Sequence, residues 1–255
     1  MRFPLRLQSW SAALLIAGLF VLPARSEAQL KLYVANGQGG FQENTYGGSE
    51  WTGMTALLDN AFGAGNVSQF SDLNDLATLL TYDRLWVDQR YLGPTLSAAE
   101  LSNIAAFIAT GRRAVLIGEN YLWADWNAQL ASLVGGTVTD DCSYVTGTVA
   151  YAHAITAGIT TVTPGCSSSV AGGTALFTNA FASLWGSSLN TLTVFDSNIQ
   201  DDFYGNQDDN EIFNANTATW LASSTVVATP EPASLILVAT GLFGLGAVVR
   251  RRRLV

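Results

Sequence analysis

The chain has 255 residues, of which 49% are hydrophobic and 13% are charged, and its formal net charge at pH 7 is −8. Between the two ends, residues 29–228 contain five basic and eighteen acidic residues, which gives this region a charge of −13. Such an acidic surface disfavours nucleic acid and anionic lipid as partners, and it favours cations or neutral partners such as glycans. A region of this length is enough for one domain with a sizeable core.

The first 28 residues have the features of a secretory signal peptide. Arg2 and Arg6 precede an apolar stretch over 12–22, which is too short to span a membrane. The small residue Ala28 stands where a signal peptidase cleaves, so we expect cleavage to leave Gln29 as the mature N-terminus. Residues 29–228 then form the exported domain.

From residue 31 onward, short apolar stretches alternate with segments of helical periodicity. We expect strands over 31–35, 67–70, 84–88 and 113–118. We expect helices over 50–62 with Ser49 as its cap, over 72–80 with Ser71 as its cap, over 97–111 with a capping box of Ser97 and Glu100, and over 126–134. This alternation predicts an α/β fold with a mostly parallel sheet and helices on both faces.

After residue 136 the pattern changes to strands and turns, and the sequence does not fix the order of these strands. We expect strands over 137–139, 174–177, 181–185 and 191–195, and a last helix over 210–222. Cys142 and Cys166 enclose a segment rich in Gly, Ser and Thr, and an exported protein favours their pairing as a disulfide. A catalytic thiol is the alternative, but neither cysteine stands between a strand and a helix.

The body of the chain also resembles the class I glutamine amidotransferase-like group. The segments that carry this resemblance are 82–87, 97–111, 114–120, 152–159, 195–198 and 209–210. It implies a flavodoxin-like fold, in which the enzymes place a nucleophilic cysteine at the turn after a central strand. Here that turn contains Glu119 between Gly118 and Asn120, so the resemblance implies a domain without the catalytic cysteine. The single histidine, His153, then has no thiol to activate, and we expect it to be structural.

Several side chains follow the strand over 113–118, at the edge where open α/β sheets place their ligands. They are Glu119, Tyr121, Trp123 and Trp126. Aromatic rings beside a carboxylate suit a sugar, so these residues are our candidate ligand site.

An acidic segment late in the chain offers oxygen ligands for calcium. Its candidate ligands are Asp196, Asn198, Asp201, Asp202, Asp208 and Asp209. The EF-hand spacing is not met, because Asp201 stands where that loop requires glycine. A solvated loop with Asp209 or Asn210 capping the last helix is the favoured interpretation, and we expect no resident cofactor.

The last 27 residues have three ordered features: Pro230-Glu231-Pro232, an uncharged apolar stretch over 233–249, and Arg250-Arg251-Arg252-Arg253. The apolar stretch would be roughly 25 Å long as a helix, near the lower limit for a membrane span, and the arginines favour the cytoplasmic side. This arrangement resembles the PEP-CTERM sorting domain. The resemblance implies a transmembrane helix that holds the exported domain on the periplasmic side of the inner membrane until exosortase processes the tail.

Two function hypotheses follow. The first is an exported protein of the envelope or extracellular matrix, sorted by exosortase, whose domain is not an enzyme and binds a partner or has a structural role. The second is a secreted hydrolase or transferase that acts on extracellular polysaccharide, with Glu119, Asp125 and Asp196 as candidate carboxylates.

Overall fold

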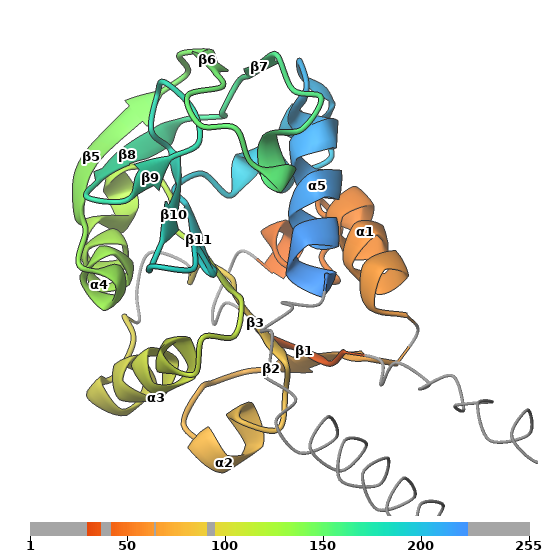
Figure 1. Cartoon of the computed structure of the whole chain (residues 1–255), viewed down its shortest axis with the longest axis vertical. Coiled ribbons are helices and arrows are strands. Elements are labelled where there is room, and N and C mark those ends of the chain that lie inside the picture. The colour runs from red at the N-terminus through yellow and green to blue at the C-terminus, as the bar shows by residue number, and fades with distance from the viewer. Residues whose placement is uncertain (1–29, 37–41, 64, 91–94, 224–255) are drawn as a thin grey trace, which may run out of the picture. The chain divides into compact units, whose positions relative to one another are not determined.

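The computed structural model describes residues 30–36, 42–63, 65–90 and 95–223 (Figure 1). The expected signal peptide with its cleavage site at Ala28 and Gln29, and the sorting tail with its apolar stretch over 233–249, lie outside the described residues. No helix in the described ranges is long and apolar enough to cross a membrane. The chain divides into two compact units, 1–222 and 223–255, and the described helices and strands belong to the first.

Seven strands form the central sheet in the order β2-β1-β3-β4-β11-β10-β9. They are β1 (Leu32–Ala35), β2 (Val67–Phe70), β3 (Arg84–Val87), β4 (Ala114–Ile117), β9 (Thr174–Ala175), β10 (Ala182–Trp185) and β11 (Thr191–Val194). The first five in this order run parallel, and β10 runs antiparallel to both of its neighbours. The predicted mostly parallel sheet is confirmed, and its parallel part follows the flavodoxin-like order.

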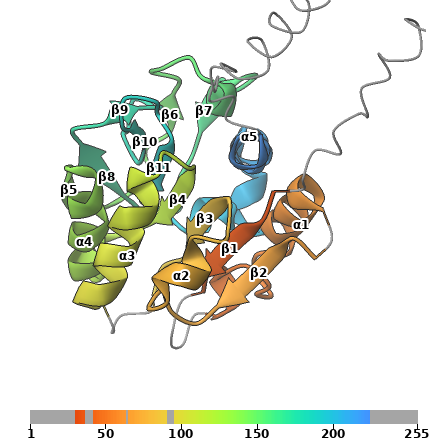
Figure 2. The ribbon, with the colours of Figure 1, turned by 60° about the horizontal axis from the view of Figure 1, so that its bottom comes forward.

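Helices cover both faces of the sheet, as predicted (Figures 1 and 2). On one face α1 (Thr52–Phe62) and α5 (Asn210–Ala222) pack on a core that includes Trp86 and Val115. On the other face α2 (Leu76–Leu79), α3 (Ala98–Ala109) and α4 (Ala124–Val134) enclose a second core that includes Leu116. Because both faces are buried, the inner strands β1, β3 and β4 are almost continuously apolar, which made them visible in the sequence.

Two predicted helix starts are wrong. The helix α1 begins after Trp51 without a side-chain cap of its own, and Ser49 plays no such role. Its first N–H groups, on Thr52 and Gly53, donate instead to Asp202, which is far away in the sequence. A distant carboxylate that satisfies the helix terminus cannot be found from local sequence.

The helix α2 has only four residues and begins after Asp75, not after Ser71. Tertiary hydrogen bonds hold the preceding segment out of the helix, because Tyr33 donates to the Asp72 carbonyl and Asn103 donates to the Leu73 carbonyl. The capping box of α3 is present as predicted, with Ser97 and Glu100 bonding each other's backbone N–H groups.

The strand-rich segment between α4 and β11 adds two small antiparallel sheets to the domain. They pair β5 (Thr137–Ser143) with β8 (Ser167–Ala171), and β6 (Gly147–Thr148) with β7 (Thr161–Val162). The predicted disulfide between Cys142 and Cys166 is confirmed, and it joins β5 to the residue before β8. The described residues also form five short 3-10 helices: η1 (Gln42–Asn44), η2 (Tyr121–Trp123), η3 (Ala154–Thr156), η4 (Asn198–Gln200) and η5 (Tyr204–Asn206).

Candidate functional site

Three buried carboxyl groups follow the ends of neighbouring parallel strands. Asp88 follows β3, Glu119 comes two residues after β4 and Asp196 two residues after β11. Parallel strands end at one edge of the sheet, which is where open α/β folds place their ligands. This edge is therefore the first place to test for chemistry.

Glu119 is fully engaged in hydrogen bonds. Its Oε2 atom accepts from the backbone N–H of Ser197 at 3.0 Å and from the Ser197 hydroxyl. Its Oε1 atom accepts from the backbone and side-chain N–H groups of Asn120 at 3.0 and 3.1 Å. Burial raises the pKa of Glu119, although these hydrogen bonds oppose the shift. The side chain thus joins the ends of β4 and β11.

The turn that carries Glu119 is held rigidly by Asn127 of α4. The side-chain oxygen of Asn127, Oδ1, accepts from the Glu119 backbone N–H at 2.9 Å, and its side-chain nitrogen, Nδ2, donates to the Glu119 backbone carbonyl at 2.7 Å. Only glycine fits before Glu119, because a Cβ on Gly118 would come within 2.4 Å of the Phe195 ring. The turn is therefore tightly packed and leaves no space beside Gly118 for a side chain.

Asp196 lies beside Glu119 and has no solvent exposure. Its Oδ2 atom accepts from the Gly165 backbone N–H at 2.7 Å, whereas Oδ1 has no partner among the described residues. Burial and the nearby charge of Glu119 raise the pKa of Asp196 well above its ordinary value. Burial likewise raises the pKa of Asp88 to about 7, against hydrogen bonds from Trp86 and Tyr46.

The carboxylates proposed for hydrolysis do not form an accessible pair. Glu119 is only 2% exposed and Asp196 is 0% exposed, and Asp125 lies exposed on α4. A glycoside hydrolase needs two carboxyl groups that flank the scissile bond of a bound substrate. The structure brings Glu119 and Asp196 together, but as buried groups.

The candidate aromatic site is dispersed. Tyr121 is 52% exposed on η2, but Trp126 is 3% exposed and donates its indole N–H to the Ile117 carbonyl at 2.9 Å. Trp123 is half-buried and donates to the Arg90 carbonyl at 2.6 Å. Of the three rings, that of Tyr121 is the most exposed.

The six oxygen ligands proposed for calcium have separate local roles. Asp202 caps α1, Asp201 accepts from the backbone N–H groups of residues 203 and 204, and Asp209 accepts from those of residues 160 and 161. Asp208 bonds the Thr163 hydroxyl, Asp196 bonds Gly165, and Asn198 starts η4. Within the described part of the chain, no group of three His, Cys, Asp or Glu residues could hold a metal ion.

His153 makes a local hydrogen bond within its own turn. Its Nδ1 atom accepts from the Ile155 backbone N–H at 3.3 Å, at the start of η3. Burial and the charge of Arg113 lower the His153 pKa, so the neutral ring is favoured. This hydrogen bond needs the neutral ring, because the nitrogen acts as an acceptor.

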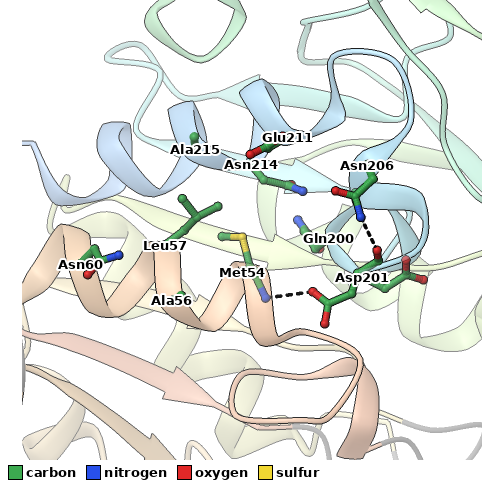
Figure 3. A pocket seen from close by; sticks show the side chains of 13 residues that line it. Met54, Ala56, Leu57, Asn60, Gln200, Asp201, Asn206, Glu211, Asn214 and Ala215 are labelled. Carbon is green, nitrogen blue, oxygen red and sulfur yellow. Dashed lines mark hydrogen bonds between the residues drawn. The ribbon is translucent and has the colours of Figure 1, made fainter.

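A pocket of about 230 Å³ lies between α1, α5 and the segment that contains η4 and η5 (Figure 3). Gln200 and Asn214 line it and are directed into the space between the two helices. Gln200 is 2% exposed, and neither polar atom of its side chain has a partner among the described residues. The Asn214 amide donates to the Ile199 carbonyl at 2.8 Å, but its Oδ1 atom has no partner there.

The sequence alone did not reveal this pocket. Gln200 stands within the acidic segment, where the carboxylates drew attention, and Asn214 stands in an amphipathic helix. A glutamine between Ile199 and a run of aspartates gives no local signal of burial. The one hint was the pair of polar residues, Asn210 and Asn214, on one face of the last helix.

Solved structures of similar fold were found. The mmIFT52 N-terminal domain matches with a TM-score of 0.57 and 13% identity, over 77% of this chain and 99% of that domain. A ThuA-like protein from Bacteroides uniformis matches with a TM-score of 0.50 and 12% identity, over 77% of this chain and 92% of that protein. A GMP synthase protein from Thermoplasma acidophilum has a TM-score of 0.49 and 13% identity, over 76% and 95% of the two chains.

At these identities the likeness concerns the fold alone, and at that level the predicted amidotransferase-like resemblance is confirmed. No curated protein matches the chain in a sequence comparison. Residues 228–253 match the PEP-CTERM protein-sorting motif, as the three ordered features of the tail predicted. The chain is therefore an exported protein that carries a PEP-CTERM sorting motif for exosortase.

Proposed function

We propose that this protein acts in the envelope or extracellular matrix as a binding protein whose α/β domain does not catalyse a reaction. The sorting motif supports display outside the cell. The observation that carries the proposal is the closed turn at Glu119, where amidotransferase-like enzymes hold their nucleophile.

The chemistry at that turn opposes acyl transfer. Glu119 is buried, and both of its oxygens accept hydrogen bonds, so it is not available to attack a substrate. The chain has two cysteines, Cys142 and Cys166, and both are consumed in the disulfide. Without a thiolate there is no nucleophile for His153 to activate, and His153 is already bonded to its own turn.

The charge of the domain indicates the kind of partner. Residues 29–228 carry eighteen acidic and five basic residues, which disfavours anionic polymers at the surface. A neutral extracellular polysaccharide fits this surface better. The domain would then be delivered by the signal peptide, held by the tail at the inner membrane, and released to the cell surface after exosortase acts near Pro230.

The experiment compares a host that has exosortase with the same host after deletion of exosortase. Intact mass is measured without reduction, for protein from membranes and from culture fluid. We expect released protein to begin at Gln29, to end near Pro230 and to lack two hydrogens because of the disulfide. Release of the same species without exosortase would contradict the sorting part of the proposal.

The binding part is tested with the host's own extracellular polysaccharide. We expect the purified protein to sediment with the polymer and to release no new reducing ends. The matched variant Glu119→Gln should likewise release no new reducing ends. Reducing ends that appear with the wild type and disappear with Glu119→Gln would establish the hydrolase instead.

A further inference from the structure

The pocket between α1 and α5 contains buried polar atoms that no described protein group satisfies. Gln200 contributes an unused donor, Nε2, and an unused acceptor, Oε1, and it is the only described residue with two such atoms. Asn214 contributes an unused acceptor, Oδ1. A buried amide without partners destabilises the folded state, and a ligand in the pocket that bonded these groups would remove that cost.

The lining excludes an anionic ligand. It contains no Lys, Arg or His among the described residues, and it includes the three acidic residues Asp201, Asp202 and Glu211. Asp201 and Asp202 already accept hydrogen bonds from backbone N–H groups, so their oxygens add negative potential to the pocket. A phosphate, sulfate or carboxylate would be repelled here.

The volume of the pocket and the polarity of its lining limit the kind of ligand further. Met54 and Leu57 of α1 and Ala215 of α5 supply an apolar wall beside the two amides (Figure 3). The volume of about 230 Å³ lies below the roughly 300–1,000 Å³ typical of drug-sized ligands, so one small unit fits and an oligomer does not. A sugar ring combines C–H faces for such a wall with neighbouring hydroxyls that both donate and accept.

The position in the fold is also that of a ligand site. The segment with η4 follows β11 directly, and the pocket is lined by α1 from Gly53 to Asn60 and by α5 from Glu211 to Ala215, which include the first turns of both helices. These turns lie next to the carboxyl edge of the parallel sheet, on the face opposite α3 and α4. Ligands of open α/β sheets bind outside the carboxyl ends of the strands.

We propose that this pocket binds one uncharged sugar residue, a terminal or branch unit of an extracellular polysaccharide. The Gln200 amide donates to one hydroxyl and accepts from its neighbour, and Asn214 Oδ1 accepts from a third. This inference rests on the proposed binding function and assigns that function a place.

Calorimetric titration of the disulfide-bonded protein from its host tests the proposal. The probes are glucose, galactose, mannose and N-acetylglucosamine, with glucuronate as the anionic counterpart of glucose. We expect at least one neutral sugar to bind saturably and glucuronate to bind more weakly. Gln200→Met should weaken that binding by about tenfold or more, because the ligand loses both amide contacts. The same substitution at an exposed position of β2 outside the pocket, Gln69→Met, should leave it unchanged.

Thermal unfolding separates a ligand site from a structural role. In the absence of sugar, Gln200→Met should raise Tm by about 2–4 °C, because it removes an unsatisfied buried amide. A lower Tm would mean that the amide is satisfied within the folded protein, and the proposal would be overturned.

The binding outcomes are equally decisive. Failure of all four neutral sugars to bind, or binding that Gln200→Met leaves intact, overturns the proposed pocket. In the second case the binding function stands and its site lies elsewhere. Turnover of the polysaccharide would instead overturn the proposed function, and the titration would still decide the pocket.

Discussion

Glu119 at the carboxyl edge of the sheet and Gln200 in the pocket between α1 and α5 are both buried polar side chains, but their hydrogen bonding is opposite. At the edge, Glu119 receives four hydrogen bonds and joins two strands. In the pocket, the Gln200 side chain neither accepts nor donates a hydrogen bond among the described residues, and it lines an open volume. Buried polar groups that satisfy one another specify a fold, whereas unsatisfied ones beside a cavity point to a ligand. The hydrogen bonds of Glu119 therefore tie the carboxyl edge together, whereas the pocket leaves polar atoms without a partner among the described residues.

The strongest test of this comparison is Glu119→Ala. The change leaves the N–H and hydroxyl of Ser197 and the two N–H groups of Asn120 without their acceptor and opens a cavity. We expect the free energy of unfolding to fall by about 5 kcal/mol, measured by urea denaturation. The control Glu43→Ala, at an exposed position of η1, should change it by less than about 0.5 kcal/mol. A loss of less than about 1 kcal/mol would show that Glu119 does not hold the edge together.

The second test uses pH. The pKa of Asp88 is raised to about 7, so the folded state holds a proton that the unfolded state releases near pH 4. Stability from this group is complete below the unfolded pKa and is lost as the pH rises through the folded pKa. We therefore expect the free energy of unfolding to decline between about pH 4 and pH 7, by up to about 4 kcal/mol from Asp88.

Glu100 affects the free energy of unfolding in the opposite direction and at lower pH, because its pKa is lowered. Burial alone would raise its pKa, but hydrogen bonds from Arg90 and Ser97 and the Arg90 charge lower it to about 2. Its contribution is lost only as the pH falls from about 4.5 toward 2. In the variant Asp88→Asn, the free energy of unfolding should decline less between about pH 4 and pH 7. Its loss below about pH 4.5, which comes from Glu100, should be unchanged. An equally steep decline in the variant would assign the effect to Glu119 and Asp196.

The third test asks whether the disulfide supports the edge. Cys166 follows Gly165, whose N–H donates to Asp196, so the Cys142–Cys166 bond holds one side of the carboxyl cluster. We expect the paired variant Cys142→Ser/Cys166→Ser to lose about 3 kcal/mol of unfolding free energy. Sugar binding at Gln200 should persist at temperatures where the variant is folded. Loss of binding in the folded variant would mean that edge and pocket are one site.

The sequence predicted the fold better than the site, and particular residues show why. The strands β3 and β4 are buried on both faces, so their apolar stretches stood out, and the Ser97 and Glu100 box is a local signal within four residues. The cap of α1 comes from Asp202, and the partner of Glu119 is Ser197, 78 residues away. Neither pair of residues can be recognised from the sequence around either partner.

The same distinction explains why the candidate aromatic residues do not gather and why the pocket was not foreseen. Trp126 follows a strand at the expected edge, but tertiary packing turns its ring into the core, where it donates to Ile117. The burial of Gln200 arises only when α1 and α5 close over the segment that holds η4. A site formed by elements from three distant parts of the chain becomes visible only in the folded structure.

The last and smallest test compares two glycines, one in each region. A Cβ on Gly118 would lie 2.4 Å from the Phe195 ring and 2.9 Å from Asn127 Oδ1, whereas a Cβ on Gly205 in the pocket would have Asn214 as its nearest neighbour at 3.5 Å. We expect Gly118→Ala to cost about 2 kcal/mol of unfolding free energy through overpacking, and Gly205→Ala to stay within about 0.5 kcal/mol. Because the Gly118 turn is fixed by Asn127 and Glu119, it cannot shift to admit the methyl group. The pocket can admit a methyl group on residue 205, because the protein does not fill the pocket's volume. Equal costs at the two glycines would contradict the distinction between a closed edge and an open pocket.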